Sequence, residues 1–368
     1  MSYAARCCSL GFSVIMCVYT LGLAAVPSFA PRDMAWLTVY LSLLGVVVVP
    51  RFLIFLCCLA GTFISKAKWC SGHAPLIRRA ALSIGVVLAS GIVFITVYGR
   101  NAGFSALAVN SFEYRSEDIP AAFDGYRIVL FSDAHVGSYI GADTCILARA
   151  VDSIEAQRPD MVVFAGDMQN MRPAEIAPVR GILARVGARD GVYSVLGNHD
   201  YSEYIKADSA ECRHNERMLI EAERSLGWDL LIDENRIIRR GDDSIVVAGM
   251  ENVSEKPFFK DKGDMEKTLA GVAPGAFVIM VQHDPRAWRS RILPECKAQL
   301  TLSGHTHGGQ IKLFGWTPVS LTYSEWGGIY AAADGRALYV STGLGGFVPF
   351  RFGLPGEIVV ITLRSSRR

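Results

Sequence analysis

Short polar motifs follow a series of apolar, strand-like runs, and they constrain the fold more than any other feature of the 368-residue chain. Four of these motifs contain five of the seven histidines, and another is a lone carboxylate after a glycine. They are Asp133-Ala134-His135, Gly166-Asp167, Gly197-Asn198-His199-Asp200, Gln282-His283-Asp284 and Gly304-His305-Thr306-His307. Strand ends in α/β folds converge on one edge of a sheet, where such folds place their binding sites. The pattern therefore predicts an α/β fold with one polar site at that edge.

The apolar runs after residue 126 alternate strands with helices at first and consist mostly of strands later. Helical periodicity predicts helices over 144–157 and 215–226. Strands are predicted over 126–131, 160–165, 192–196, 244–248, 277–281, 300–302, 337–341 and 357–363. This order favours packed mixed sheets with helices on the outside.

Residues 1–103 differ in composition from the rest of the chain. Of 37 basic and 35 acidic residues, they hold 8 and 1, which leaves 29 basic and 34 acidic residues for 104–368. Apolar stretches near 10–30, 34–64 and 80–98 are long enough to cross a hydrocarbon core of about 30 Å as transmembrane helices. Pro50-Arg51 interrupts the second stretch and allows one kinked span or a tight hairpin, of which we favour one span. The alternative for the first stretch is a cleaved signal peptide.

The basic residues between the second and third stretches predict the orientation in the membrane. Lys66, Lys68, Arg78 and Arg79 lie there without an acid, so the positive-inside rule places that loop in the cytoplasm. The third span then delivers the following residues to the other side. We expect an integral protein of the cell inner membrane whose second part, after residue 103, is extracytoplasmic. A hairpin at Pro50 would move the N-terminus and leave that second part where it is.

Charge and cysteine content exclude several classes of function. The domain after residue 103 has more acidic than basic residues, which argues against a nucleic-acid partner. It holds only Cys145, Cys212 and Cys296, without CxxC spacing, so no disulfide framework or zinc knuckle is expected. We divide the chain into a membrane anchor (1–103), a linker with the strand that leads into the domain (104–125) and a catalytic domain (126–368).

The motifs contain the ligand types that a pair of metal ions needs for phosphoester chemistry. They offer carboxylates, one amide oxygen and imidazole nitrogens, from Asp133, His135, Asp167, Asn198, His283, His305 and His307. Mixed nitrogen and oxygen ligands favour two divalent transition metals such as Mn, Fe or Zn over Ca. Two ions about 3.5–4 Å apart stabilise charge on a phosphoryl group and activate water at neutral pH. His199 is not needed as a ligand and could donate a proton to the leaving oxygen.

In this order the motifs resemble the calcineurin-like metallophosphoesterase superfamily, whose pattern is D-x-H, G-D-x-x-D, G-N-H-[DE], a lone His and G-H-x-H. The resemblance covers about residues 126–363 and implies a four-layer α/β/β/α sandwich. It implies that one metal is held by Asp133, His135, Asp167 and His307. It implies that the other is held by Asp167, Asn198, His283 and His305. His199 would be the catalytic histidine.

The membrane-anchored bacterial branch of that superfamily looks closest, through Tyr98-Gly99-Arg100-Asn101 and the stretches 304–310 and 343–357. The branch implies a phosphoester, phosphodiester or pyrophosphate substrate, nucleotide-linked or lipid-linked, such as UDP-2,3-diacylglucosamine-like molecules. One departure is Asn170, where an Asp that orients the catalytic histidine is usual. Asn170 can still bond an imidazole but adds no negative charge. We expect Asn170 and Asp200 to support the ligands from behind.

Some residues and functions keep two interpretations. Arg351 lies in a Gly/Pro-rich turn and either clamps a phosphate or is a surface arginine. Four aromatic residues follow the last motif and either line a cleft or membrane-facing rim or pack the loop onto the sheet; they are Trp316, Tyr323, Trp326 and Tyr330. The competing functions are a non-catalytic scaffold of the same fold, although every ligand position is filled, and a nuclease of the same superfamily.

Overall fold

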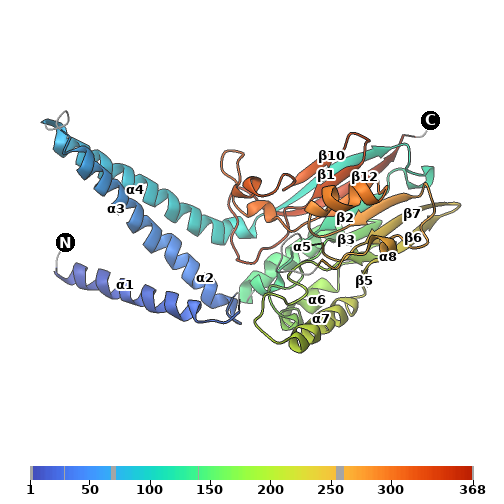
Figure 1. Ribbon diagram of the computed structural model, residues 1–368, viewed down its shortest axis with the longest axis horizontal. Coiled ribbons are helices and arrows are strands. Elements are labelled where there is room, and N and C mark those ends of the chain that lie inside the picture. The colour runs from blue at the N-terminus through green and yellow to red at the C-terminus, as the bar shows by residue number, and fades with distance from the viewer. Residues whose placement is uncertain (1–2, 29, 68–71, 140, 254–260, 367–368) are drawn as a thin grey trace. The chain divides into compact units, whose positions relative to one another are not determined.

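The structure is a computed structural model of the 368-residue chain (Figure 1). It describes all residues except 1–2, 29, 68–71, 140, 254–260 and 367–368, so Lys68 of the basic loop lies outside the described residues. The chain divides into two compact units, Met1–Gly103 and Phe104–Arg368. Each unit has its own secondary structure and is described by itself.

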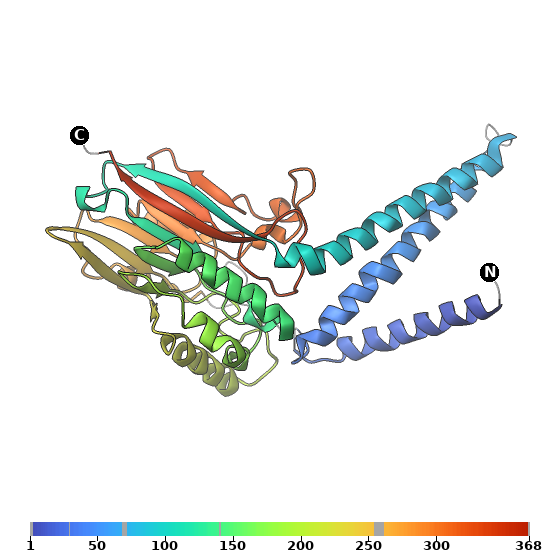
Figure 2. The same cartoon turned by 180° about the vertical axis from the view of Figure 1, so that it is seen from behind.

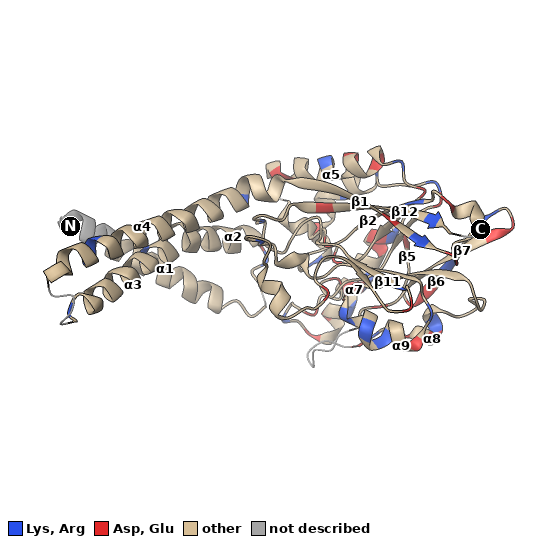
Figure 3. Ribbon diagram, turned by 90° about the horizontal axis from the view of Figure 1, so that it is seen from above, with Lys and Arg blue, Asp and Glu red and all other residues tan. Residues whose placement is uncertain are grey.

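Every secondary-structure element that the structure describes in the first unit is a helix. Its helices are α1 Tyr3–Ala24, α2 Met34–Leu43, α3 Val49–Ile64 and α4 Ala74–Tyr98, with π-helical segments η1 Leu44–Val48 and η3 Gly99–Gly103. In Figure 3 these helices are almost entirely uncharged, whereas both signs of charge are spread over the second unit. Two continuous helices, Met34–Ile64 and Ala74–Gly103, are long and apolar enough to cross a membrane.

The helix over Met34–Ile64 runs unbroken through Pro50, so the structure excludes a hairpin there. The π-helical segment immediately before Pro50 accounts for this, because a proline cannot donate to the carbonyl one turn earlier and its ring clashes with that carbonyl. A wider turn relieves the clash without ending the helix. The first predicted span, 10–30, lies closer to the N-terminus than predicted, because α1 begins at Tyr3 and ends at Ala24. The third is longer than predicted and begins at Ala74.

The second unit contains two six-stranded sheets. The first has the order β1-β12-β2-β3-β4-β5, with β1 Leu107–Ser116, β2 Arg127–Phe131, β3 Met161–Phe164, β4 Val192–Ser194, β5 Asp229–Leu230 and β12 Gly356–Ser365. The second has the order β10-β11-β9-β8-β7-β6, with β6 Glu234–Arg240, β7 Asp243–Gly249, β8 Phe277–Val281, β9 Leu300–Ser303, β10 Gly328–Ala331 and β11 Ala337–Val340. The run from β2 to β5 is parallel, as is the run of β7, β8, β9 and β11.

Helices cover the outer face of each sheet (Figures 1 and 2). The first sheet is covered by α5 Thr144–Ala156, α6 Arg180–Leu183 and α7 Ser209–Arg224. The second is covered by α8 Met265–Thr268, the π-helical η9 Trp288–Ile292 and α9 Leu293–Glu295. Short 3-10 turns in the loops are η4 Ala121–Phe123, η5 Val136–Ser138, η6 Gly141–Asp143, η7 Pro173–Glu175, η8 Ala177–Val179, η10 His307–Gly309 and η11 Pro318–Leu321. The layers are therefore α/β/β/α, as predicted.

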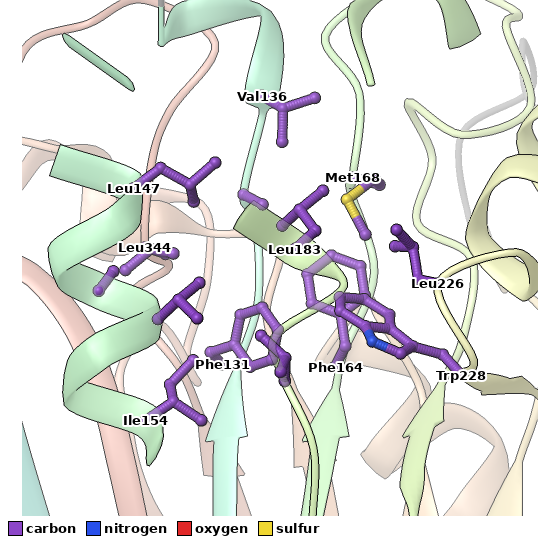
Figure 4. Packing of buried hydrophobic residues seen from close by; sticks show 14 of the residues in the cluster. Phe131, Val136, Leu147, Ile154, Phe164, Met168, Leu183, Leu226, Trp228 and Leu344 are labelled. Carbon is purple, nitrogen blue, oxygen red and sulfur yellow. The ribbon is translucent and has the colours of Figure 1, made fainter. Parts of the chain in front are cut away.

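Side chains of the central strands alternate between two cores. In β2, Val129 and Phe131 pack under the helices, whereas Ile128 and Leu130 pack between the sheets. The helix-side core also holds Phe164 and Trp228, which lie against Phe131 in Figure 4. Successive strand residues point to opposite faces, so a strand that is buried on both faces is apolar throughout. This explains why the predicted strands appear in the sequence as continuous apolar runs.

All eight predicted strands are present, with ends that differ from the prediction by at most two residues. The helix predicted over 215–226 begins six residues earlier, because Asp208 caps it by accepting hydrogen bonds from the backbone of Ala210 and Glu211. The sequence interpretation missed β5, β6 and β10. The strand expected within 104–125 is β1, which pairs along its whole length with β12 and belongs to the compact second unit.

Candidate metal centre

The predicted ligands lie in loops that follow five strands and come from both sheets. Asp133 and His135 follow β2, Asp167 follows β3, Asn198 follows β4, His283 follows β8, and His305 and His307 follow β9. The loops after β2 and β9 are joined directly, since the backbone N–H of His305 donates to the Asp133 carboxylate at 3.0 Å. The structure therefore brings all seven predicted ligands to one edge of the sandwich.

Five of these ligands have a left-handed backbone conformation. The φ values are 51° at Asp133, 44° at His135, 62° at Asp167, 74° at His305 and 51° at His307. Residues other than glycine rarely adopt such values, which cost on the order of 1–3 kcal/mol each where the surroundings impose them. The sheets hold these loops in unfavourable conformations, and the result is that the side chains converge.

The first group of ligands consists of Asp133, His135, Asp167 and His307, whose ligand atoms lie within 4.8 Å of one another. His135 Nε2 is 3.5 Å from Asp167 Oδ2 and 3.2 Å from His307 Nε2. His307 Nε2 is 3.5 Å from Asp133 Oδ1. These spacings are those of atoms that face a common point.

The second group consists of Asp167, His283 and His305, again with ligand atoms within 4.8 Å of one another. His283 Nε2 is 3.2 Å from Asp167 Oδ2. Asn198 joins this group, because its Oδ1 is 3.1 Å from His283 Nε2 and 2.6 Å from His305 Nδ1. Asp167 is common to both groups, which is the position of a bridging carboxylate.

The hydrogen bonds behind the imidazoles fit metal ligation. The Nδ1–H of His283 donates to the carbonyl of Ala165 at 2.7 Å, and that of His135 donates to the carbonyl of Gln169 at 3.2 Å. Each bond places a proton on Nδ1 and directs Nε2 towards the group, as in metal-binding histidines. His135 Nε2 and His307 Nε2 lie 3.2 Å apart, an arrangement that a cation beside both nitrogens would stabilise. The residues present therefore fit divalent metal ions.

Burial and charge set the protonation of the group. Burial lowers the pKa of His135 to about 3 and that of His305 to about 4, and it lowers the pKa of His307 well below its usual value. Burial also acts to lower the pKa of His283, but Asp167 and Asp133 outweigh it and raise the pKa to about 10. Three imidazoles are thus held neutral, the form that binds metal, while the carboxylates attract positive charge.

Asp200 holds the backbone of the shared Asp167 from behind. Its buried carboxylate accepts hydrogen bonds from the backbone N–H groups of Asp167 at 2.8 Å, Met168 at 2.9 Å and Gly197 at 2.8 Å. These bonds join the loop after β3 to the loop after β4. The two loops approach so closely that a Cβ at Gly197 would lie 2.2 Å from Asp167 Oδ1. Only glycine fits at this position, and the supporting role of Asp200 stays a prediction.

The ring of His199 lies against that of His135 in the first group, with centroids 4.7 Å apart. Its Nδ1–H donates to the main-chain carbonyl of Asn170 at 2.7 Å, and its ring stacks on Tyr204 with centroids 4.2 Å apart. Its backbone N–H donates to Asp167 Oδ1 at 2.8 Å. Burial lowers the pKa of His199. The ring is therefore oriented by a hydrogen bond to the main chain and by stacking on Tyr204. Nδ1 makes that hydrogen bond, so Nε2 is the nitrogen left for chemistry.

The side chain of Asn170 differs from the prediction, because its amide makes no hydrogen bond to His199 among the described residues. Its Nδ2 donates to Ser138 Oγ at 2.9 Å and to the carbonyl of Phe347 at 2.9 Å. It thus joins the loop after β3 to the loops after β2 and β11. The replacement of the usual Asp by Asn at this position leaves the hydrogen bond to His199 intact, because the main chain makes it.

Arg351 is neither a phosphate clamp nor a surface arginine, the two interpretations that its sequence context allowed. It is completely buried, and its guanidinium donates to the carbonyls of Thr342, Gly343, Gly345 and Pro355. A guanidinium enclosed in this way cannot clamp a phosphate, and it is not on the surface. It shapes the 342–355 loop, which in turn bonds the backbone of the Asp133 loop through Gly345 N–H.

The aromatic residues after the last motif divide between the two interpretations. Tyr323 reaches the metal group, with its hydroxyl 2.8 Å from His305 Nε2. Trp326 and Tyr330 pack the loop, since the Trp326 carbonyl accepts from Thr306 Oγ1 and its N–H donates to the Tyr330 hydroxyl. Trp316 is half exposed. Sequence reasoning missed Tyr204, whose hydroxyl accepts from Asn198 Nδ2 at 2.7 Å, because no motif marks it.

A two-sheet sandwich with such a ligand group at its strand ends is a metallophosphoesterase domain. The profile of the calcineurin-like phosphoesterase family matches residues 126–309. The chain belongs to this family.

Two relatives are similar to this chain in sequence, and one solved structure is reported beside them. A transmembrane protein with metallophosphoesterase domain from Danio rerio is 28% identical over 341 residues, which cover 90% of this chain and 74% of that protein. The uncharacterized metallophosphoesterase YkuE from Bacillus subtilis is 30% identical over 261 residues, which cover 68% of this chain and 84% of that protein. A phosphopantetheinyl hydrolase structure from Mycobacterium tuberculosis is similar to 62% of this chain and 91% of its own, with 13% identity and a TM-score of 0.38.

Proposed function

We propose that this protein is a membrane-anchored two-metal phosphoesterase that hydrolyses phosphoester, phosphodiester or pyrophosphate bonds. The observation that carries this proposal is the sharing of Asp167 between two groups of ligands, with His199 at their side. A structural metal site closes around a single ion, whereas paired ions with a shared carboxylate are typical of phosphoester hydrolysis. Divalent transition metals suit the mixed nitrogen and oxygen ligands.

Each residue then has a defined part in the reaction. Two ions held by the two groups would neutralise charge on the phosphoryl oxygens and activate water for attack on phosphorus. His199 would donate a proton from Nε2 to the leaving oxygen, and a proton from the attacking water would replace it; the Asn170 carbonyl holds the other proton on Nδ1 throughout. Asp200 and Arg351 do not meet the substrate. They hold the Asp167 and Asp133 loops in the conformation that the ligands need.

The membrane anchor of the proposal rests on the helices Met34–Ile64 and Ala74–Gly103 and on the name of the Danio rerio relative. The basic residues between these helices favour an extracytoplasmic catalytic domain. Only residues 104–106 separate the second helix from β1, so the domain is tethered within about 10 Å of the helix end. A tether this short favours a substrate with a lipid-linked part, which is concentrated at the bilayer.

The two competing functions have less support. A scaffold that lost catalysis would be expected to lose ligands, and here all seven side chains are present and converge. A nuclease would be expected to attract a polyanion, whereas residues 104–368 carry an excess of acidic over basic residues.

The proposal is tested with the full-length protein in detergent. We expect metal bound to the protein and turnover of p-nitrophenyl phosphate or bis-p-nitrophenyl phosphate with Mn, Fe or Zn. His214→Ala is the matched control, because this exposed histidine on α7 lies outside the centre and its loss should leave both readouts unchanged. A folded protein that binds no metal after loading would refute the two-metal proposal. Metal binding without turnover of any phosphoester would favour the scaffold.

Orientation and substrate class need separate experiments. Two reporters are fused after residue 368, one that is active only outside the cytoplasm and one that is active only inside it. We expect activity from the first; activity from the second alone would refute the orientation. A lipid-linked phosphodiester or pyrophosphate should be hydrolysed faster than its delipidated head group by the enzyme in vesicles. Equal turnover of the two would remove the case for a lipid-linked substrate.

A further inference from the structure

An aromatic side chain occupies the tip of a tight turn in the loop after the last metal motif. Leu313 and Trp316 exchange two backbone hydrogen bonds, of 2.8 and 2.9 Å, around the pair Phe314-Gly315. Both residues of the pair have positive φ, 51° at Phe314 and 85° at Gly315. Such two-residue turns normally begin with Asn, Asp or Gly, since a bulky residue is strained there. Phe314 is fully exposed, so no packing within the described residues compensates for the strain.

Further exposed apolar residues follow within the same loop. Trp316 is 52% exposed and Leu321 is 77% exposed. Lys312 precedes the turn, with its ammonium 5.4 Å from the centre of the Trp326 ring. We refer to residues 312–321 as the apolar loop. Clustered exposed apolar residues mark a surface that meets a partner, and Trp beside Lys is typical of contact with lipid head groups.

Hydrogen bonds attach the apolar loop to the loops that carry the predicted metal ligands. Thr317 Oγ1 donates to the carbonyl of Gly308 at 2.7 Å, directly after the ligand His307. Two residues after the loop, Tyr323 reaches His305. At its other end, Lys312 N–H donates to the carbonyl of Phe352 at 2.8 Å. Whatever the apolar loop contacts therefore lies beside the metal-binding loops.

The chain enters the second unit at this same edge. Ala106, one residue before β1, accepts from the N–H of Gly356 at 2.9 Å, and Gly356 directly follows the loop that contains Phe352. Phe104 packs its ring against Tyr139, with centroids 5.3 Å apart, just beyond the His135 loop. The residues that precede Phe104 form the apolar helix Ala74–Gly103. The anchor and the apolar loop thus both join the domain at its metal-binding edge.

We propose that the apolar loop inserts into the lipid bilayer interface, with Phe314 and Trp316 as its anchoring side chains and Lys312 among the head groups. The strained Phe314 is then explained, since the turn projects the ring outward and lipid covers it. Insertion adds a second attachment to the helical anchor and holds the metal centre against the head groups. This inference needs no turnover and goes beyond the proposed hydrolysis.

Photocrosslinking of the full-length protein in vesicles of phosphatidylethanolamine and phosphatidylglycerol tests the inference. A p-benzoylphenylalanine replaces Phe314 and conserves an aromatic ring at the tip. The same residue at Val87, which is exposed on α4, reports whether the anchor is in the bilayer. At Ile237, an exposed apolar residue of β6, it provides the matched negative control. We expect lipid adducts at 87 and at 314, with about tenfold more at 314 than at 237, as burial of one aromatic ring would give.

Lipid adducts at 87 without an excess at 314 over 237 would overturn the inference. Cross-linked dimers at 314 in place of lipid adducts would also overturn it and would identify a second copy of the chain as the partner. A second measurement avoids the artificial residue: shallow brominated lipids should quench the part of the fluorescence that Trp316→Phe removes. If that part is not quenched, the loop is not in the interface. Neither readout depends on catalysis, so failure here is distinct from failure of the proposed hydrolysis.

Discussion

The strands of the second unit and the loops at their ends obey opposite rules, and the change occurs within two residues. Val129 and Phe131 are apolar, extended and buried in the helix-side core. Asp133 and His135 are polar, left-handed in backbone and just as completely buried. The comparison teaches that stability and chemistry are divided along each strand. Burial of the apolar part stabilises the fold. This stabilisation offsets the cost of holding strained, desolvated side chains at the polar end.

The largest effect of a single substitution is expected where two strand ends share one carboxylate. Asp167→Asn removes the negative charge that both ligand groups need, so the protein should lose most of its metal while keeping its fold. Turnover should fall by more than the roughly 10²–10³-fold that loss of one charge-stabilising group costs. Elemental analysis and circular dichroism measure the two outcomes. Asn198→Ala, which removes a neutral ligand of one group only, is the comparison and should retain more metal.

Removal of His199 separates proton transfer from metal binding. His199→Ala should retain metal and lose about 10²–10⁴-fold in turnover, the usual contribution of a general acid or base. The reason is that its ring bonds to the Asn170 carbonyl and is not among the converging ligand atoms. Metal content and kcat are measured on the same preparation. Loss of both metals would show that His199 is a ligand and that the assignment is wrong.

A substitution in the strand below should have the opposite signature. Phe131→Ala removes a buried ring that packs against Phe164 and Trp228, and it should lower the free energy of unfolding by about 3–5 kcal/mol. Protein that remains folded should still bind metal. Ile237→Ala on β6 is the matched control, because that side chain is about half exposed and should cost little. If Phe131→Ala reduced metal binding but not stability, the division between strand and loop would fail.

The division also explains how much the sequence could predict. The seven predicted ligands lie directly after strands that are buried on both faces, so a local pattern of apolar run and polar motif located the converging side chains, His199 and the strands that carry them. The missed strand β6 shows the limit. It lies at a sheet edge and contains only Ile237 and Ile238 as apolar residues, while Arg236 pairs with Asp229. Edge strands tolerate charge, and they leave no apolar run in the sequence.

Roles that depend on contacts between distant segments could not be predicted either. Arg351 is buried because the 342–355 loop folds around its guanidinium, which no spacing of residues in the sequence indicates. Phe314 is marked in the sequence only by the following glycine. Its exposure and left-handed backbone emerge from the turn itself.

A buried carboxylate behind the loops offers a pH-dependent test of the scaffold. Glu223 on α7 is fully buried, and burial, with a smaller effect of Asp200, raises its pKa to about 8. Because this pKa is above the usual value of 4.5, folding takes up a proton, and stability should fall as pH rises from 4.5 towards 8. The slope contributed is at most about 1.4 kcal/mol per pH unit.

Glu223→Gln should therefore flatten the decrease of the unfolding temperature between pH 5 and pH 8, measured by thermal unfolding of the full-length protein. Glu221→Gln, an exposed neighbour on the same helix, is the control and should leave the decrease unchanged. Equal slopes for the wild type and Glu223→Gln would mean that Glu223 is solvated in solution.

The smallest effect on turnover is expected where the sequence suggested a defect. Asn170→Asp restores the residue that is usual in the family, and if residue 170 oriented His199 through its side chain, activity would rise. The structure assigns that bond to the main chain, so kcat should not increase. The substitution should instead lower stability by about 1–3 kcal/mol, because an ionised Asp cannot donate to Ser138 Oγ and the Phe347 carbonyl as the amide does. Asn170→Ala, which leaves the carbonyl in place, should likewise keep the pH profile of kcat.

A rise in kcat for Asn170→Asp, with a shifted pH profile, would show that the side chain of residue 170 turns towards His199 during the reaction. The orientation of His199 would then depend on a side chain and not on the main chain of the loop. The strands that fix that main chain would then determine less of the geometry of the site than the comparison of strand and loop implies.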